Sequence, residues 1–146
     1  MREILFRGKA INREIGYFRT SYKNGDWVYG LVSKLYDERF ENLPAEMTNT
    51  YGVSGIDVDY KTIGQYTGLT DKNGEMIFEG DILIYSVIIM HTVVHEQNVK
   101  ITFKKGSFCM EEMNGVSHPL FHNTENTRLE IIGNIHDNPE LLKGDE

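Results

Sequence analysis

The feature that most constrains the fold is residues 63–81, which read IGQYTGLTDKNGEMIFEGD. The dipeptide Asn73-Gly74 at its centre predicts a tight hairpin, because Asn and Gly tolerate the positive φ angles that such a turn requires. The short apolar run 76–78 follows as a strand, and Gly80 then predicts a bulge or a tight bend. We therefore expect strand, turn, strand, turn and strand in that order.

Further strands are predicted on both sides of this stretch by alternating polar and apolar residues and by many β-branched side chains. A second turn, Asn24-Gly25, joins two candidate strands, so the N-terminal part is predicted to be a small antiparallel meander. The candidate strands are residues 2–10, 15–22, 27–32, 56–61, 82–89, 92–103, 107–113 and 128–135. Residues 114–127 are polar and predict a loop.

The segment between the two groups of strands differs in kind. Apolar side chains in residues 33–49 fall at roughly helical spacing before Pro44, and either a short helix or a long loop fits this pattern. Residues 43–55 are rich in Asn, Thr, Gly and Ser, which indicates a domain boundary or a loop. We therefore predict two parts, 1–55 and 56–146, which form either separate domains or one compact unit.

The end of the chain predicts a short helix. Asn138 is a suitable N-cap, Pro139 suits the first helical position, and Glu140 suits the helix N-terminus. With little other helix and about five closely spaced strands in the second part, the fold class is mainly β. We expect the C-terminal part to be a small SH3-like barrel.

The charge of the chain disfavours one class of partner. Its 146 residues carry a formal net charge of −7, and an acidic surface repels phosphate backbones. Basic residues cluster only near the start, at Arg2, Arg7, Lys9 and Arg13, and we expect them to occupy solvent-facing positions of the first strand.

Cysteine usage and hydropathy indicate a cytoplasmic protein. Cys109 is the single cysteine, so an intramolecular disulfide and the usual zinc frameworks are excluded, and we expect a buried, inert thiol. The start of the sequence has no signal-peptide pattern, and the longest apolar run, 82–90, is too short to span a bilayer.

Two histidine pairs are the candidate metal ligands. His91 and His95 stand four apart, which on a helix would place both imidazoles on one face, but the valines between them favour a strand, where they lie about 13 Å apart. His118 and His122 repeat the spacing around Pro119. The simpler interpretation of this pair is a loop with two exposed histidines. Whether the two pairs meet in space does not follow from the sequence, and we predict no metal or cofactor.

Other candidate groups are better explained by structure than by chemistry. Asp57 with Asp59, and Glu79 with Asp81, are carboxylate pairs beside glycines, where acidic side chains commonly bond turn backbone. Phosphate-binding, nucleophile-elbow and dinucleotide motifs are absent from the sequence. We therefore expect no catalytic residues and no enzyme activity.

Trp27 and Tyr29 fall on the same face of a predicted strand. They belong either to the core, which is the default for large aromatic side chains, or to a contact surface.

Three segments together resemble the YopX family of bacteriophage and prophage proteins. They are Arg7-Gly8-Lys9 with Trp27-Val28-Tyr29-Gly30, the run 62–81, and the ending 132–142, which reads IGNIHDNPELL. The resemblance covers nearly the whole chain, although Tyr60 stands where a Pro is expected and residues 33–55 and 90–127 carry no family pattern. It implies a mainly β fold with an SH3-like part and common self-association, and it defines no catalytic or binding residues.

The resemblance and the residues together favour a non-enzymatic phage accessory protein that forms homo-oligomers. Alternatives are an acidic protein that binds a host protein, such as a nucleic-acid enzyme with a basic cleft, and, less favoured by the charge, a nucleic-acid-binding barrel. A metal-dependent enzyme that uses the histidine pairs ranks last. We expect any functional surface in the two segments without family pattern.

Overall fold

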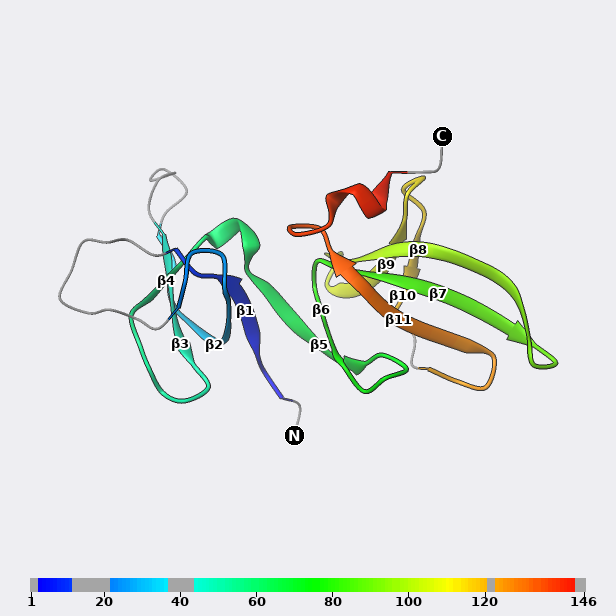
Figure 1. The fold of residues 1–146 in the computed structure, drawn as a ribbon, viewed down its shortest axis with the longest axis horizontal. Coiled ribbons are helices and arrows are strands. Elements are labelled where there is room, and N and C mark those ends of the chain that lie inside the picture. The colour runs from blue at the N-terminus through cyan, green and yellow to red at the C-terminus, as the bar shows by residue number, and fades with distance from the viewer. Residues whose placement is uncertain (1–2, 12–21, 37–43, 121–122, 144–146) are drawn as a thin grey trace. The chain divides into compact units, whose positions relative to one another are not determined.

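The protein is mainly β, and its described strands form two antiparallel sheets without a closed barrel (Figure 1). The computed structural model describes residues 3–11, 22–36, 44–120 and 123–143. The predicted fold class is confirmed, whereas the SH3-like barrel is not. Contacts divide the chain into two compact units, residues 1–65 and 66–146, so residues 56–58 belong with the N-terminal strands and not with the C-terminal part where composition placed them.

The N-terminal unit is a sheet in the order β4-β3-β2-β1. Its elements are β1 (Phe6–Lys9), β2 (Trp27–Lys34), β3 (Ala45–Asn49), β4 (Ile56–Val58) and the 3₁₀ helix η1 (Tyr60–Thr62). The prediction of a loop over residues 45–49 is wrong, because Ala45 and Met47 alternate with polar residues and are buried in a strand that pairs with β4. Residues 12–21 and 37–43, which hold most of the predicted strand 15–22 and the predicted helix, lie outside the described residues.

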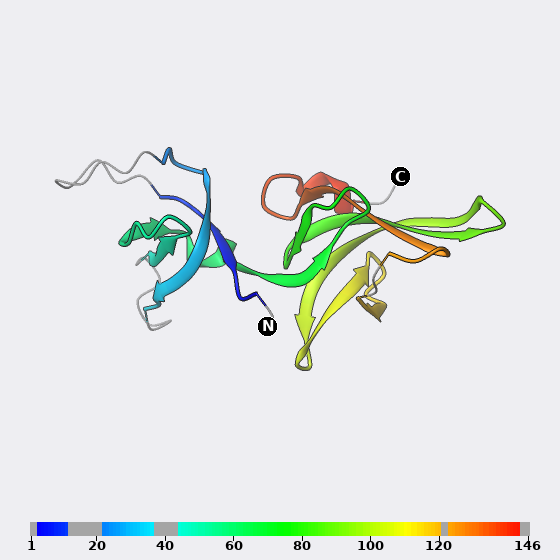
Figure 2. The ribbon, with the colours of Figure 1, turned by 90° about the horizontal axis from the view of Figure 1, so that it is seen from below.

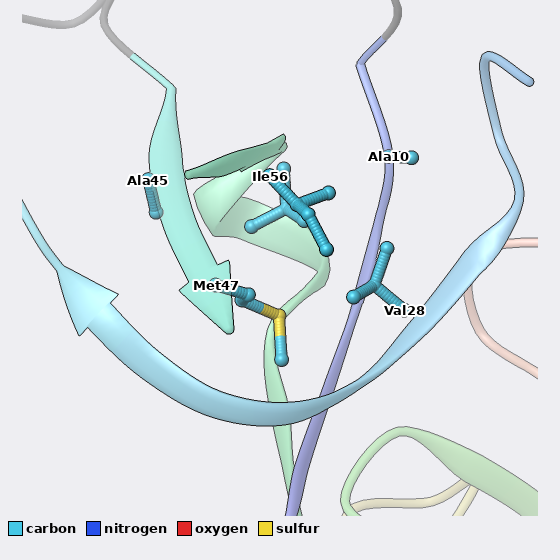
Figure 3. Packing of buried hydrophobic residues seen from close by; sticks show 6 residues of the cluster. Ala10, Val28, Ala45, Met47 and Ile56 are labelled. Atoms are coloured by element: carbon cyan, nitrogen blue, oxygen red, sulfur yellow. The ribbon is translucent and has the colours of Figure 1, made fainter. Parts of the chain in front are cut away.

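Alternation along the strands builds the core of this unit. Val28 and Met47 point inward together with small residues, as Figure 3 shows, while the intervening side chains of β2 point away. Gly30 lies in the same inward row, and a Cβ there would be 1.9 Å from the backbone oxygen of Thr48. Only glycine therefore permits β2 and β3 to approach as they do. The core residues are Ala10, Val28, Ala45, Met47, Ile56 and Val58.

Strand β5 (Gly64–Thr70) begins in the first unit and ends in the second. Its first residues pair with β1, with Gly64 opposite Arg7. Its later residues pair with β6 (Met76–Phe78), and the register shifts around Gly68, whose φ is +86°. The predicted hairpin around Asn73-Gly74 is confirmed.

The C-terminal unit contains a five-stranded sheet in the order β10-β9-β8-β7-β11. It also contains β6, which pairs with β5 and ends the six-stranded order β4-β3-β2-β1-β5-β6. Its remaining elements are β7 (Asp81–Ile89), β8 (Thr92–Lys104), β9 (Ser107–Glu112), β10 (Ser117–Pro119), β11 (Thr127–Asn134) and the 3₁₀ helix η2 (Pro139–Leu142). The four strands predicted after residue 81 are confirmed, but β10 lies where a loop was predicted. The core consists of Ile77, Leu83, Val99, Ile101, Met110 and Leu129.

The predicted terminal helix is limited to the four residues of η2. Pro139 begins it, as the sequence indicates, but the Asn138 side chain makes no capping hydrogen bond. Instead, Asn138 Oδ1 accepts from the backbone N–H of Asn134, and a Cβ at Gly133 would lie 2.5 Å from that oxygen. The Asn138 side chain therefore fastens this segment to the end of β11.

Candidate interaction surface

The acidic residues of the central stretch bind backbone groups. Asp71 is buried, and its Oδ1 accepts from the N–H groups of Asn73 and Glu75 at 2.8 and 3.0 Å. Its Oδ2 accepts from the N–H of Ile131 at 3.1 Å, which ties the β5–β6 turn to β11. The buried carboxylate of Asp81 accepts from the N–H of Phe78 at 2.7 Å. These acids therefore hold turns and strands together.

The polar residues of the C-terminal segment 132–142 are used in the same way. Asn134 is buried, and its Oδ1 accepts from the N–H groups of His136 and Asp137. Gly80, with φ +90°, donates its N–H to Ile101 and accepts from the N–H of Ile135. Backbone geometry thus accounts for the polar and glycine residues in both patterns.

The histidine pairs form no metal centre within the described residues. No group of three or more His, Cys, Asp and Glu side chains gathers there as a metal site would require. His91 lies in the turn that follows β7, whereas His95 lies on β8 beyond an irregularity in the pairing. His118 lies on β10 with its Nε2 3.5 Å from Glu112 Oε1, and His122 lies outside the described residues.

The other candidates from the sequence are dispersed. Cys109 is half-buried on β9, not fully buried as predicted, with its Sγ 3.7 Å from the Ser107 Oγ. Asp59 caps η1 by accepting from the N–H of Lys61, while Asp57 pairs in register with Glu46 on the neighbouring strand. Neither arrangement brings a nucleophile and a base together.

The aromatic and basic residues of the first unit share the outer face of its sheet. Trp27 and Tyr29 alternate with buried Val28, so they face outward, and of the two alternatives left open by the sequence the default, a place in the core, is the wrong one. The Trp27 ring lies 4.5 Å from the Arg7 guanidinium and 5.4 Å from the Lys9 ammonium. Arg7 is buried, so the expectation that it is a solvent-facing charge is also wrong. Arg2 and Arg13 lie outside the described residues.

A charged cluster occupies β8 and β9. Glu111 contacts Lys104 and lies 3.4 Å from Lys100, and the hydrogen bond from Lys104 is the main cause of the lowered pKa of Glu111. The pKa of Glu112 is also lowered, chiefly by a hydrogen bond from Gln97. These carboxylates line only a small depression with Lys100, Met113 and Leu142, so their arrangement resembles solvated ion pairing across strands.

The most distinctive surface of the second unit is the end of the β7–β8 hairpin. We call residues 88–96 the β7–β8 arm, and Figure 2 shows it extending beyond the other strands of its unit. Its exposed apolar side chains have exposed fractions of 55% for Ile89, 90% for Met90, 50% for Val93 and 54% for Val94. Contiguous apolar exposure of this kind marks an interaction site more often than a solvated surface.

One edge of the arm carries no partner strand within the described part of the chain. Strand β9 pairs with β8 only from Val99 onward, and β7 covers the other side of β8 from Thr92 to Lys100. Residues 92–96 are all exposed, and we call them the open edge. Such an edge presents a row of backbone donors and acceptors for another strand.

The arm ends in a turn whose positive φ angles are unfavourable for the two residues that form it, Met90 and His91. Met90 and His91 have φ angles of +50° and +64°, a conformation that disfavours side chains with a Cβ. The hairpin turns at Asn24-Gly25 and Asn73-Gly74 use glycine at a positive-φ position instead. The arm therefore keeps a large apolar side chain at its tip at a conformational cost. The tip lies in residues 90–127, one of the two segments where the sequence led us to expect a functional surface, but its apolar run is indistinguishable in sequence from a core strand.

No helix in the described residues has the length and hydropathy to cross a bilayer.

The fold defines a mainly β protein of two antiparallel sheets. The polar side chains of its sequence motifs accept hydrogen bonds from backbone N–H groups of turns and neighbouring strands. The chain belongs to the YopX family: the family model described as YopX protein matches residues 10–143. This confirms the resemblance noted in the sequence.

A solved structure has a similar fold over the length of the chain. The chain is similar to the crystal structure of protein EF1440 from Enterococcus faecalis, with 25% sequence identity and a TM-score of 0.50. The match covers 98% of this chain and 100% of that chain. A comparison with curated proteins found no match.

Proposed function

We propose that the protein is a non-enzymatic accessory protein of a phage or prophage that acts in the host cytoplasm by assembling with copies of itself. The observation that carries this proposal is the exposed, apolar β7–β8 arm. Residues 82–95 contain no Asp, Glu, Lys or Arg, although the chain as a whole carries a net charge of −7. An uncharged apolar surface on an acidic protein is where two copies can approach with the least repulsion.

The composition of the arm supports a contact with protein. Methionine and β-branched side chains adapt to apolar partners, and burial of such surface is the main driving force for association. Since the signature carboxylates and amides bond backbone, the family pattern accounts for folding, and the arm lies outside the residues that carry this pattern.

The test is the molar mass in solution as a function of protein concentration. We expect multi-angle light scattering to show a mass above the monomer that rises with concentration for the natural chain. The double variant Val93→Lys with Val94→Lys should shift association to at least about tenfold higher concentration, because two charges would have to be buried in the contact. A monomeric natural chain at the highest soluble concentration contradicts the proposal.

A matched control is available on the first unit. Val53 has an exposed fraction of 49%, nearly equal to those of Val93 and Val94, and lies in the β3–β4 connection. Val53→Lys therefore adds a charge at an equally exposed valine and should leave association unchanged. Unfolding curves for all variants separate lost contacts from lost folding.

A second candidate function is the binding of a basic host protein, favoured by the net charge of −7. Capture from a bacterial lysate would enrich one basic partner, with binding that weakens as salt rises. Nucleic-acid binding is disfavoured by the same charge, and a flat anisotropy titration with DNA and RNA at low salt is expected.

A further inference from the structure

We infer that Met90 is a site of reversible oxidation, where a peroxide converts the thioether at the tip of the β7–β8 arm to a sulfoxide. The site is assigned from the exposure of this side chain and from its position in the turn. The consequence for assembly rests on the proposed function and concerns how that contact is regulated.

Met90 is the most exposed methionine among the residues that the structure describes. Its exposed fraction is 90%, compared with 46% for Met113 and 38% for Met76. Met47 and Met110 are fully buried in the two cores. Because the oxidant must touch the sulfur, accessibility ranks these side chains, and Met90 should react first.

The turn presents this side chain where a chemical change leaves the fold intact. The arm extends beyond the other strands of its unit (Figure 2), and the Met90 side chain packs little against its own chain. An added oxygen there meets solvent, whereas at buried Met110 it would disrupt close packing. The turn itself does not require a methionine, since glycine adopts its positive φ angle at lower cost. The exposed thioether is therefore a feature of the surface and not of the core.

The reaction is a two-electron transfer of oxygen. A lone pair on Met90 Sδ attacks one peroxide oxygen, and the O–O bond breaks as the S–O bond forms. The proton of the transferred hydroxyl passes to the departing oxygen, which leaves as water, so the sulfur is oxidised and the peroxide is reduced. A thiol-dependent methionine sulfoxide reductase reverses the change, converting two thiols to a disulfide and releasing the oxygen as water.

Oxidation would change the polarity of the arm. Its exposed apolar side chains are Ile89, Met90, Val93 and Val94, and of these four the methionine alone contains sulfur. A sulfoxide is polar, and burying it without a hydrogen-bond donor is costly. Assembly through the arm and oxidation of Met90 should therefore oppose each other, because assembly covers the thioether and oxidation makes the covered state less favourable.

The first test is the order of oxidation in the natural chain at a concentration below association. Hydrogen peroxide is the probe, and peptide mass spectrometry measures the gain of one oxygen at each methionine. Met90 should react at least about threefold faster than Met113 or Met76, while Met47 and Met110 stay unoxidised in the folded chain. A rate at Met90 no higher than the rate at Met113 overturns the assigned site.

The response to pH separates this site from Cys109. A thioether has no proton to lose, so the Met90 rate should be equal at about pH 6 and about pH 8, whereas a cysteine reacts as its thiolate and therefore faster as pH rises. Cys109→Ser should leave the Met90 rate unchanged. A reaction at Met90 that is lost in this variant would make Cys109 the primary site and contradict the inference.

The second test is the effect of oxidation on assembly, followed by light scattering. Chain oxidised at Met90 should need at least about tenfold higher concentration to associate, and treatment with methionine sulfoxide reductases should restore the original behaviour. Met90→Leu has no sulfur at the tip, so peroxide should not change the association that this variant shows. Met113→Leu is the matched control and should respond to peroxide as the natural chain does.

The two tests distinguish failure of the inference from failure of the proposed function. A natural chain that associates equally well before and after oxidation of Met90 refutes the regulatory role. A natural chain that stays monomeric at every concentration refutes the proposed self-assembly and its regulation, and the order of oxidation then decides the assigned site by itself.

Discussion

At the scale of single residues, Asp71 shows how one side chain can connect distant parts of a fold. Its two carboxylate oxygens accept three backbone N–H groups, two within its own turn and one from Ile131 on β11. The sequence indicates the turn, because Asp before Asn-Gly commonly bonds its own backbone. The bond to Ile131 depends on which strand lies beside the turn, and the local sequence pattern does not indicate which strand that is.

Asp71→Ala should strongly destabilise the second unit. The change removes a buried carboxylate that accepts three backbone N–H groups, and we expect a loss of about 3 kcal/mol in the free energy of unfolding. Urea denaturation followed by far-ultraviolet circular dichroism measures it. Asp59→Ala removes an acceptor that is only half-buried at the start of η1, and should cost about 1 kcal/mol. Equal losses for both variants would contradict the role given to Asp71.

The sequence left open, at this same scale, whether Trp27 and Tyr29 face the core or a contact surface. Alternation shows that they share a face, but does not show which face is buried. The choice is made by Val28 and Gly30, which lie against Met47 and Thr48, and the required close approach at Gly30 becomes visible only in the folded sheet.

At the scale of elements, the strongly patterned strands were predictable and the weak ones were not. Strands β7 and β8 carry long β-branched runs, and their bounds agree closely with expectation. Strands β3 and β10 are short and rich in polar residues, so propensity favoured a loop in both places. Pairing with a neighbour, not intrinsic preference, makes them strands.

In the turn of the β7–β8 arm, the residues that we expect to favour association are also expected to lower the stability of the fold. Replacing Met90-His91 by Asn-Gly removes the cost of two positive-φ residues, and should stabilise the chain by about 1–2 kcal/mol. The same change removes the exposed Met90 side chain and should weaken association. Thermal unfolding at a concentration below association, combined with light scattering above it, measures both effects. Unchanged association would show that the Met90 side chain is not part of the contact.

The Glu111 cluster should add stability at neutral pH that is lost in acid. Contact with Lys104 and proximity to Lys100 lower the pKa of Glu111 in the folded chain. The stabilisation is therefore present above the ordinary carboxyl pKa and disappears as pH falls through the lowered one. Glu111→Gln should be less stable than the natural chain at pH 7 and nearly equal to it in strong acid. Unfolding curves across this range test the prediction, and a difference that does not shrink on acidification contradicts it.

At the scale of the whole molecule, net charge determines how association responds to salt. Two copies with a formal charge of −7 each repel one another, and added salt screens this repulsion over a distance that falls to about 10 Å at 0.1 M. Self-association through an uncharged arm should therefore strengthen from low salt to about 0.3 M. Sedimentation equilibrium measures the change. Binding to a basic host protein would weaken over the same range, so the direction of the effect separates the two functions.

Mainly β architecture and the family were accessible from the sequence, whereas the division of the chain was not. Composition placed a boundary near residue 55, because residues 43–55 resemble a loop. Contacts place residues 56–65 with the first unit, since β4 pairs with β3 and Gly64 pairs with Arg7. Polar composition reports exposure, and exposure does not reveal which strands pair across a loop.

The continuity of β5 has a consequence for any gene fragment made from this chain. Residues 64–65 complete the pairing of β1, and residues 66–70 complete the pairing of β6. A cut anywhere within this strand deprives one fragment of its partner strand and leaves an unpaired edge there, which promotes aggregation. Fragments designed to carry either unit alone should therefore both include residues 64–70, so that the same seven codons appear at the end of one and at the start of the other.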